Sequence, residues 1–185
     1  MGKGTMTVRD DVASAEAASS TVDVGREAEL VLEAALHFVA SKMRLRGPQD
    51  ALDHLCAGQR AAHGYFRYAL AQEVMASLAA LDGEVVAGYL YDDEATPEDE
   101  AFGEVSPVSL IHLIVRASRP TEALSSLIAS LDRALVAGYG EMIGRPHLAH
   151  LLDVQVLSED DINAGRGAAA LLNSVHHRPV KVWER

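Results

Sequence analysis

The chain has 185 residues, of which 49% are hydrophobic and 23% are charged, a balance that excludes a disordered protein. No apolar run reaches the roughly 18 to 20 residues of a membrane span, and the first residues lack the apolar segment of a signal peptide, so we expect a cytoplasmic protein that contacts no membrane. The formal net charge of -11, from 27 acidic and 16 basic residues, argues against general nucleic-acid binding, because Lys and Arg supply most of that affinity.

The chain begins with residues 1–22, which are rich in Ala, Ser, Thr and Asp without a sustained period and predict a flexible N-terminal arm. Residues 23–59 predict a helical extension. Its first helix stops near Gly47-Pro48, and a short helix follows over 49–57. The single cysteine, Cys56, excludes an intramolecular disulfide and a multi-Cys zinc site, and its apolar neighbourhood predicts a buried, inert thiol.

The remaining segment, 60–185, is predicted to form one domain. A long helix over 60–81 ends at the Asp82-Gly83 turn, and the apolar run 85–91 predicts a strand. Residues 92–104 contain seven acids and no base and predict a loop.

Strand and helix patterns alternate in the rest of this domain. A second strand is expected over 108–115, followed by an amphipathic helix that begins at Arg119-Pro120-Thr121 and ends at Gly138 or Gly140. A third strand over 151–157, a short helix over 168–175 and an edge strand over 178–183 follow. The order predicts an α+β fold: a small mixed sheet of about four strands flanked by helices, with the N-terminal helical extension.

Strand periodicity places His112 on one face of the second strand together with Leu110 and Ile114. Asp153 and Gln155 share one face of the third strand by the same rule. If these two strands are neighbours, His112 and Asp153 could meet across the ladder. A register shifted by one residue would turn Ile111 and Leu113 to that face instead.

The order of these elements resembles the small nucleotidyltransferase domains related to DNA polymerase β. In that family a Gly-Ser turn follows the first strand, the second strand carries two carboxylates one residue apart, and the next strand carries a third. Here the turn reads Asp92-Asp93, the carboxylate pair reads Leu110 and His112, and the third position holds Asp153. The resemblance therefore implies a nucleotidyltransferase-like domain over 60–185 with a degenerate catalytic motif.

The resemblance also implies what the site would hold. In the family the carboxylates bind two magnesium ions, which need oxygen ligands, so a leucine and an imidazole at two of the positions weaken the site and no cofactor is expected. Asp92 and Asp93 place negative charge where the nucleotide phosphates would lie. If the protein is active, Asp153, Asp92 and Asp93 are the expected ligands of Mg²⁺ or Mn²⁺, with Glu94 as a possible further ligand and His112 in a base role.

Three functions remain open at this stage. The first is a catalytically degenerate protein with a binding or regulatory role, in which His112 and Asp153 form a hydrogen-bonded pair and the partner is a nucleotide or a protein; a homodimer is also possible. The second is an active enzyme that moves a nucleoside monophosphate from a triphosphate to a small molecule or protein. The third, indicated by the N-terminal helices alone, is a partner-binding module of toxin–antitoxin type.

Two other residue groups have a structural and a functional interpretation. His147 and His150 could bind zinc with His176 or His177, although loop histidines are the simpler interpretation. The aromatic residues Tyr65, Phe66 and Tyr68 lie near Arg67 and could form a stacking surface, but their helical spacing favours a packing face against the sheet or a dimer interface.

Overall fold

The computed structural model of the protein describes residues 9–91, 110–174 and 178–185, with side chains described from residue 24 onward. Within these ranges the expected α+β class is confirmed, with six helices and a four-stranded mixed sheet. The elements in chain order are α1 (Arg9–Met43), α2 (Pro48–Cys56), α3 (Arg60–Leu81), β1 (Val85–Tyr91), β2 (Ile111–Ala117), α4 (Glu122–Met142), β3 (Leu152–Leu157), α5 (Glu159–Ala164), α6 (Ala169–Leu172) and β4 (Val180–Glu184).

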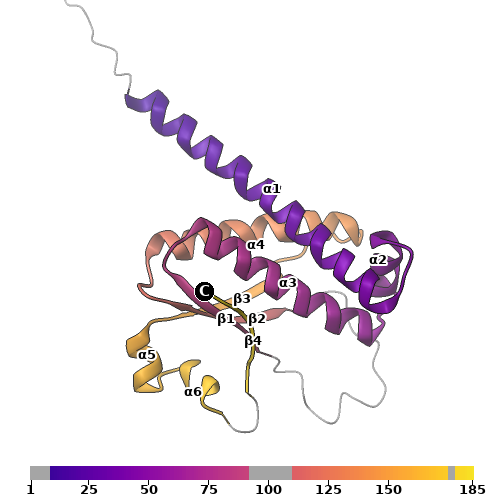
Figure 1. The fold of residues 1–185 in the computed structure, drawn as a ribbon. Helices are drawn as coiled ribbons and strands as arrows, with labels where there is room; N and C mark the ends of the chain where they lie inside the picture. The colour runs from indigo at the N-terminus through magenta and orange to yellow at the C-terminus, as the bar shows by residue number, and fades with distance from the viewer. Residues whose placement is uncertain (1–8, 92–109, 175–177) are drawn as a thin grey trace, which may run out of the picture.

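The sheet has the strand order β3-β2-β1-β4. Strand β1 pairs antiparallel with β2 and with β4, whereas β2 and β3 are parallel and are joined through α4. Figure 1 shows the long helices α1, α3 and α4 on one face of the sheet and the short helices α5 and α6 on the other. Strand β4 lies at the sheet edge, as predicted for the last strand.

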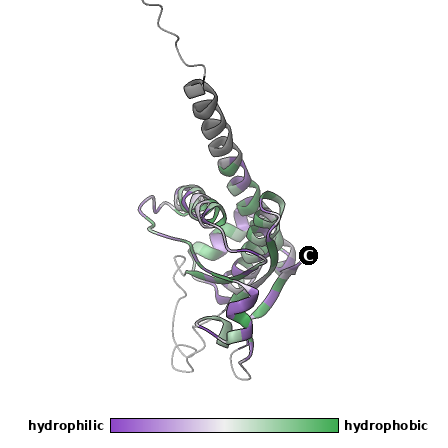
Figure 2. Ribbon diagram, turned by 90° about the vertical axis from the view of Figure 1, so that its left-hand side faces the viewer, coloured by the Kyte–Doolittle hydropathy of each residue, from purple (hydrophilic) through white to green (hydrophobic). Residues whose placement is uncertain are grey.

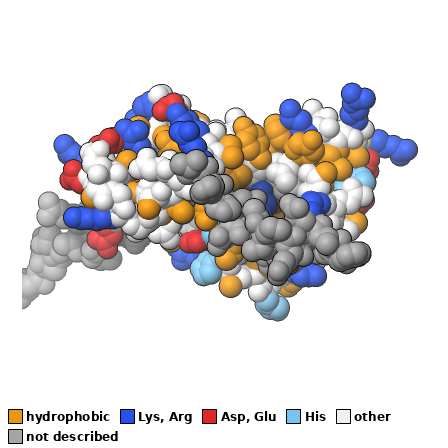
Figure 3. Space-filling model, turned by 90° about the horizontal axis from the view of Figure 1, so that it is seen from below, with side chains coloured by type: hydrophobic (Ala, Val, Ile, Leu, Met, Phe, Trp, Pro, Cys, Tyr) orange, Lys and Arg blue, Asp and Glu red, His pale blue; other side chains and the backbone are white. Residues whose placement is uncertain are grey.

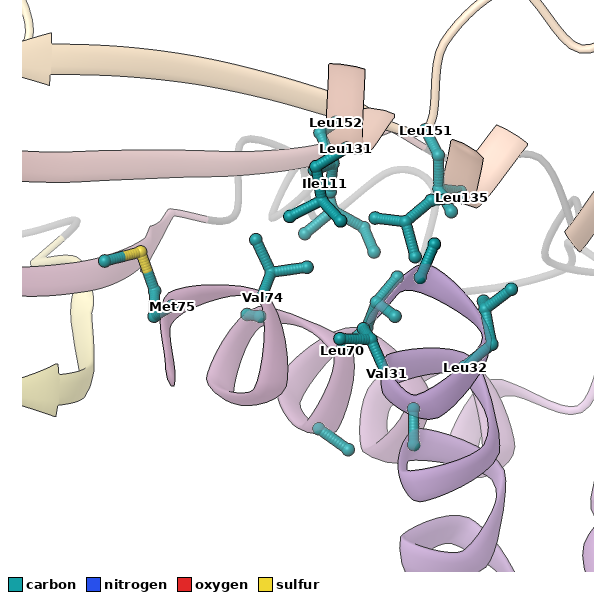
Figure 4. Close-up of a cluster of buried hydrophobic side chains, with 14 of the residues drawn as sticks. Val31, Leu32, Leu70, Val74, Met75, Ile111, Leu131, Leu135, Leu151 and Leu152 are labelled. Carbon is teal, nitrogen blue, oxygen red and sulfur yellow. The ribbon is translucent and has the colours of Figure 1, made fainter. Parts of the chain in front are cut away.

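The main core lies between the sheet and the long helices. Alternate residues of β2 point into it, and Ile111, Leu113 and Val115 are at most 1% exposed. Figure 4 shows Ile111 facing Val74 of α3 and Leu131 of α4. Figure 2 shows hydrophobic and hydrophilic segments interleaved along the helices, as expected where one face of each helix is buried.

A second, small apolar cluster forms on the opposite face of the sheet. It consists of Ile114, Leu157 and Ala169, with side chains of α5 and α6 packed around it. Successive side chains of a strand point to opposite faces, so alternate residues of β2 belong to different clusters. The face that carries α5 and α6 is therefore only partly covered by apolar packing, and its remaining positions hold polar side chains.

Helix α1 begins at Arg9 and so includes most of the segment 1–22 for which the sequence predicts an arm. The predicted divisions after residues 22 and 59 are not marked by separate cores, because buried residues of α1, from Val24 to Ala40, belong to one cluster with those of α3 and α4. Ala, which occurs four times in residues 1–22, favours a helix even without an apolar period. The three-part division of the chain stays a prediction.

Several boundaries differ from the expected ones. Helix α4 continues to Met142 rather than stopping at Gly138 or Gly140. The carbonyl oxygen of Arg145 lies 2.8 Å from where a Cβ of Gly140 would be, so the glycine serves a close approach of the backbone here and not the end of the helix. The helix expected over 168–175 is reduced to α6. The helix α5 was not expected, although its Ser158–Asp161 capping box is a recognisable start signal.

The prediction of a buried Cys56 is wrong. Cys56 is exposed, because it is the last residue of α2, and that helix buries a face made of Ala51, Leu52 and Leu55 instead.

The second strand is also displaced from its expected position: it covers Ile111–Ala117, while residues 108 and 109 lie outside the described ranges. Among the helices that the structure describes, none combines the length and apolar composition needed to cross a bilayer.

Candidate functional site

His112 and Asp153 lie side by side on the face of the sheet that carries α5 and α6. They are partners in the parallel β2–β3 register, and the Nδ1 of His112 is 2.9 Å from the Oδ2 of Asp153. The two residues therefore meet as the strand periodicity predicted, and the alternative register, with Ile111 and Leu113 on this face, is wrong because both of those are buried on the other. The side chains are 30% and 47% exposed, which leaves the pair open to a ligand.

A buried carboxylate on α4 fixes the start of β3. Asp132 is 6% exposed, and its Oδ1 accepts hydrogen bonds from the backbone N–H groups of Leu151 and Leu152 at 3.0 and 2.9 Å. Its Oδ2 lies 2.8 Å from the Nδ1 of His150. Asp132 thereby holds the residues directly before Asp153, and so positions Asp153 beside His112. Sequence analysis missed this residue, whose only signal was an acid next to Leu131 in an apolar helical stripe.

The His112–Asp153 pair lies in a pocket of about 210 Å³. Strands β1, β2 and β3 form its floor, and Ala168 and Leu171, in and next to α6, form one side. The described residues that line it are Tyr91, His112, Leu113, Ile114, Asp153, Gln155, Ala168 and Leu171. Its volume equals that of about seven water molecules at ~30 Å³ each, so it suits a small molecule.

Among the described residues that line the pocket, few are ionisable and none is Lys or Arg. Tyr91 is paired with His112 in the antiparallel β1–β2 register, so the ionisable side chains of these residues, those of Tyr91, His112 and Asp153, come from three adjacent strands. When His112 is neutral, Asp153 gives the lining a net negative charge. Gln155, one side-chain step along β3 from Asp153, adds an amide that can donate or accept.

Two basic side chains of this face, Arg116 and Lys181, are paired with acids. The Nη2 of Arg116 lies 2.9 Å from the Oε2 of Glu159. The Nζ of Lys181 lies 2.8 Å from the Oε2 of Glu184, and this hydrogen bond raises the pKa of Lys181. The same bond lowers the pKa of Glu184. Figure 3, which views the molecule from below, shows basic, acidic and hydrophobic side chains interspersed among the coloured residues.

Arg166, in the loop between α5 and α6, also has an acid beside it. Hydrogen bonds from the hydroxyl and the backbone N–H of Ser158 hold the pKa of Asp161 below its ordinary value, and the positive charge of Arg166 lowers it further. Arg116, Lys181 and Arg166 therefore each have an acid beside them, and none of these three is among the described residues that line the pocket.

The structure brings only part of the expected metal site together. In the described ranges, no three His, Cys, Asp or Glu side chains converge to hold a metal ion. Asp92 and Asp93, and with them Glu94, lie outside these ranges, so their expected role in binding a nucleotide or Mg²⁺ or Mn²⁺ stays a prediction. His112 and Asp153 would supply only two metal ligands, and their side chains are hydrogen-bonded to each other.

Of the histidines considered for zinc, His150 pairs with Asp132, His147 is exposed, and His176 and His177 lie outside the described ranges. The aromatic residues form packing contacts within the chain, but these are with helices and not with the sheet. Phe66 stacks on Tyr139 of α4 with ring centroids 5.1 Å apart, and Tyr65 and Tyr68 contact Phe38 of α1. Burial raises the pKa of Tyr139, whose phenol therefore stays neutral.

Comparison with known proteins found no significant match to a family model, to a curated protein or to a solved structure. The interpretation of the pocket therefore depends on the geometry and charge of its own residues.

Proposed function

We propose that the chain is a nucleotidyltransferase-like domain protein whose catalytic site is degenerate and serves as a small-molecule-binding pocket with a regulatory role. The observation that carries this proposal is the hydrogen bond between His112 and Asp153. A carboxylate that binds magnesium for catalysis directs its oxygens to the ion, together with other oxygen ligands. Here an oxygen of Asp153 faces an imidazole nitrogen instead, and an imidazole is a poor ligand for so hard an ion.

The size and lining of the pocket support a ligand that is small and partly apolar. Pockets for drug-sized ligands have volumes of about 300 to 1,000 Å³, and this one has about 210 Å³. Ile114 and Leu171 supply apolar contact area, while Gln155 and the His112–Asp153 pair supply the polar groups that orient a ligand. A few polar groups in an otherwise apolar concavity are the usual composition of a binding site.

The first experiment separates a binding pocket from an active enzyme. Thermal unfolding is measured with each of the four ribonucleoside triphosphates, with and without Mg²⁺ or Mn²⁺. A ligand at about 100 times its Kd stabilises by roughly 2.7 kcal/mol, which raises the Tm of a domain of this size by about 5 to 11 °C. We expect no metal-dependent rise. A metal-dependent rise with one nucleotide that Asp153→Asn abolishes would instead establish the active enzyme.

The second experiment tests the pocket directly by filling it. Ala168 lines the pocket, whereas Ala170, on the same short helix, is exposed and does not. A library of small organic fragments is screened by saturation-transfer NMR on the wild type, on Ala168→Leu and on Ala170→Leu. We expect fragments that bind the wild type and Ala170→Leu but not Ala168→Leu. If no fragment shows this dependence, the pocket does not bind small molecules and the proposal fails. That result is also the one expected for a module that acts only through protein partners.

A further inference from the structure

We infer that the pocket selects a small organic cation that carries an N–H or O–H donor, and that it discriminates against anions, including nucleotides. This inference rests on the proposed binding function and adds the chemical class of its ligand. It combines three observations: the orientation of His112, the charge balance of the lining, and the placement of Tyr91.

The orientation of His112 predicts an acceptor in the pocket. The Nδ1 of His112 faces a carboxylate oxygen of Asp153 at 2.9 Å. Because an ionised carboxylate can only accept, Nδ1 carries a proton and donates it, and in the singly protonated, uncharged ring Nε2 is then an acceptor. Within the described ranges Nε2 makes no hydrogen bond. A ligand that satisfies it must present a donor.

The charge balance favours a positive ligand. Glu159 and Glu184 are each paired with a basic side chain, and Asp161 has Arg166 beside it. Among the described residues, Asp153 pairs with His112 alone, whose uncharged form adds no positive charge, and none of those that line the pocket is Lys or Arg. A cation in the pocket gains the attraction of Asp153 in a partly water-excluded environment, whereas an anion is repelled by it. The net charge of -11 acts in the same direction at longer range.

The placement of Tyr91 adds an aromatic wall on the side of β1. Tyr91 lies opposite His112 in the β1–β2 pair and lines the same pocket. The face of an aromatic ring attracts an ammonium group, and this attraction strengthens when the cation is partly desolvated. A cation between Asp153 and Tyr91 is therefore stabilised from two strands, and its apolar part can contact Ile114 and Leu171.

The test uses two probes that share a phenol ring and differ in the charge of the other end. Tyramine is the cation and 4-hydroxyphenylacetate is the anion, and the Kd of each is measured by NMR titration of the full chain. We expect tyramine to bind more tightly by about tenfold or more, given one unit charge in the lining. Ala168→Leu should abolish this binding and Ala170→Leu should leave it intact.

Matched charge variants show where the preference arises. Asp153→Asn keeps an oxygen that can accept from the Nδ1 of His112 but removes the charge, and we expect the preference for tyramine to disappear. Asp160→Asn makes the same change on an exposed residue of α5 outside the lining and should leave the preference unchanged. A preference lost equally in both variants would show attraction to the acidic protein as a whole and would overturn the inference.

The failure of this inference is distinguishable from that of the proposed function. Fragments whose binding depends on Ala168 but shows no preference for tyramine over 4-hydroxyphenylacetate would refute the cation selectivity and leave the binding pocket established. The absence of any Ala168-dependent ligand would refute both.

Discussion

The two faces of the sheet are built from alternate residues of the same strands, yet their composition differs sharply. On the face covered by α1, α3 and α4, Ile111, Leu113 and Val115 of β2 are almost completely buried. On the face that carries α5 and α6, His112 and Asp153 remain partly exposed in a pocket. The first face supplies most of the apolar burial that stabilises the fold. This leaves the second face free to hold polar groups that would be costly in a closed core.

The largest expected effect separates two adjacent residues of β2. Ile111→Ala removes a side chain that is 1% exposed within the main core, and it should lower the free energy of unfolding by about 2 to 5 kcal/mol. His112→Ala, one residue further on the other face, should cost less than about 1 kcal/mol, because an exposed pair of this kind contributes little to stability. Urea unfolding monitored by circular dichroism measures both values.

The same pair of variants can contradict the comparison. If His112→Ala destabilises the protein as much as Ile111→Ala does, the pocket face is part of the folding core and not a surface reserved for a ligand. Ligand binding gives the opposite ranking, because His112→Ala should abolish it while Ile111→Ala should leave it intact at temperatures where the protein is folded.

Asp132 is a buried polar residue on the helix-covered side, and its removal should have the next largest effect. Asp132→Ala leaves the N–H groups of Leu151 and Leu152 without their acceptor. Hydrogen bonds to a charged group contribute about 1.5 to 3 kcal/mol, so we expect a loss of about 2 to 3 kcal/mol in urea unfolding. Because these residues directly precede Asp153, the Kd of a pocket ligand should also rise.

His150→Ala is the matched control for Asp132. It removes the only other side chain that the structure shows bonded to Asp132 within the described ranges, but the His150 side chain is 70% exposed. We expect a loss below about 1 kcal/mol and no change in ligand affinity. A loss equal to that of Asp132→Ala would show that the ion pair, and not the backbone hydrogen bonds, holds β3 in place.

Sequence reasoning predicted the elements of the helix-covered face well, because long periodic segments such as α3 and β1 depend on local apolar spacing. It also predicted that His112 and Asp153 would meet, since strand alternation fixes which side chains share a face once two strands pair. The pocket itself could not be predicted. Its wall depends on α6 packing over the sheet, and the anchoring role of Asp132 depends on a contact with residues 151 and 152, 19 and 20 positions away.

A glycine tests how closely helix α3 approaches the sheet on the covered face. A Cβ added at Gly88 of β1 would overlap the side chain of Met75, lying 2.5 Å from its Sδ. Gly88→Ala should therefore cost about 1 to 3 kcal/mol. Combining it with Met75→Ala should cost less than the sum of the two single changes, because the smaller side chain leaves room for the new methyl group.

Gly64→Ala is the control for this substitution. Gly64 lies within α3, and an added Cβ would meet no atom within 4 Å. The same chemical change should here stabilise the protein by about 0.5 to 1 kcal/mol, because alanine favours a helix more than glycine does. Destabilisation by both substitutions would mean that backbone conformation, and not contact with Met75, determines the cost at Gly88.

The smallest expected effect concerns the Arg116–Glu159 ion pair, which links β2 to α5 on the pocket face. The pair has good geometry, with Nε and Nη2 of Arg116 at 3.0 and 2.9 Å from one carboxylate oxygen, but the side chains are 33% and 57% exposed. A double-mutant cycle with Arg116→Ala and Glu159→Ala should give a coupling of about 0.2 to 1 kcal/mol, and less at high salt.

The Arg116–Glu159 pair matters more for the charge near the pocket than for the stability of the fold. Glu159→Ala frees the cation of Arg116 on the pocket face, so it should weaken the preference for a cationic ligand, whereas Arg116→Ala should strengthen it. Equal shifts in the same direction from both variants would show that the pair acts on the pocket through the position of α5 and not through its charges.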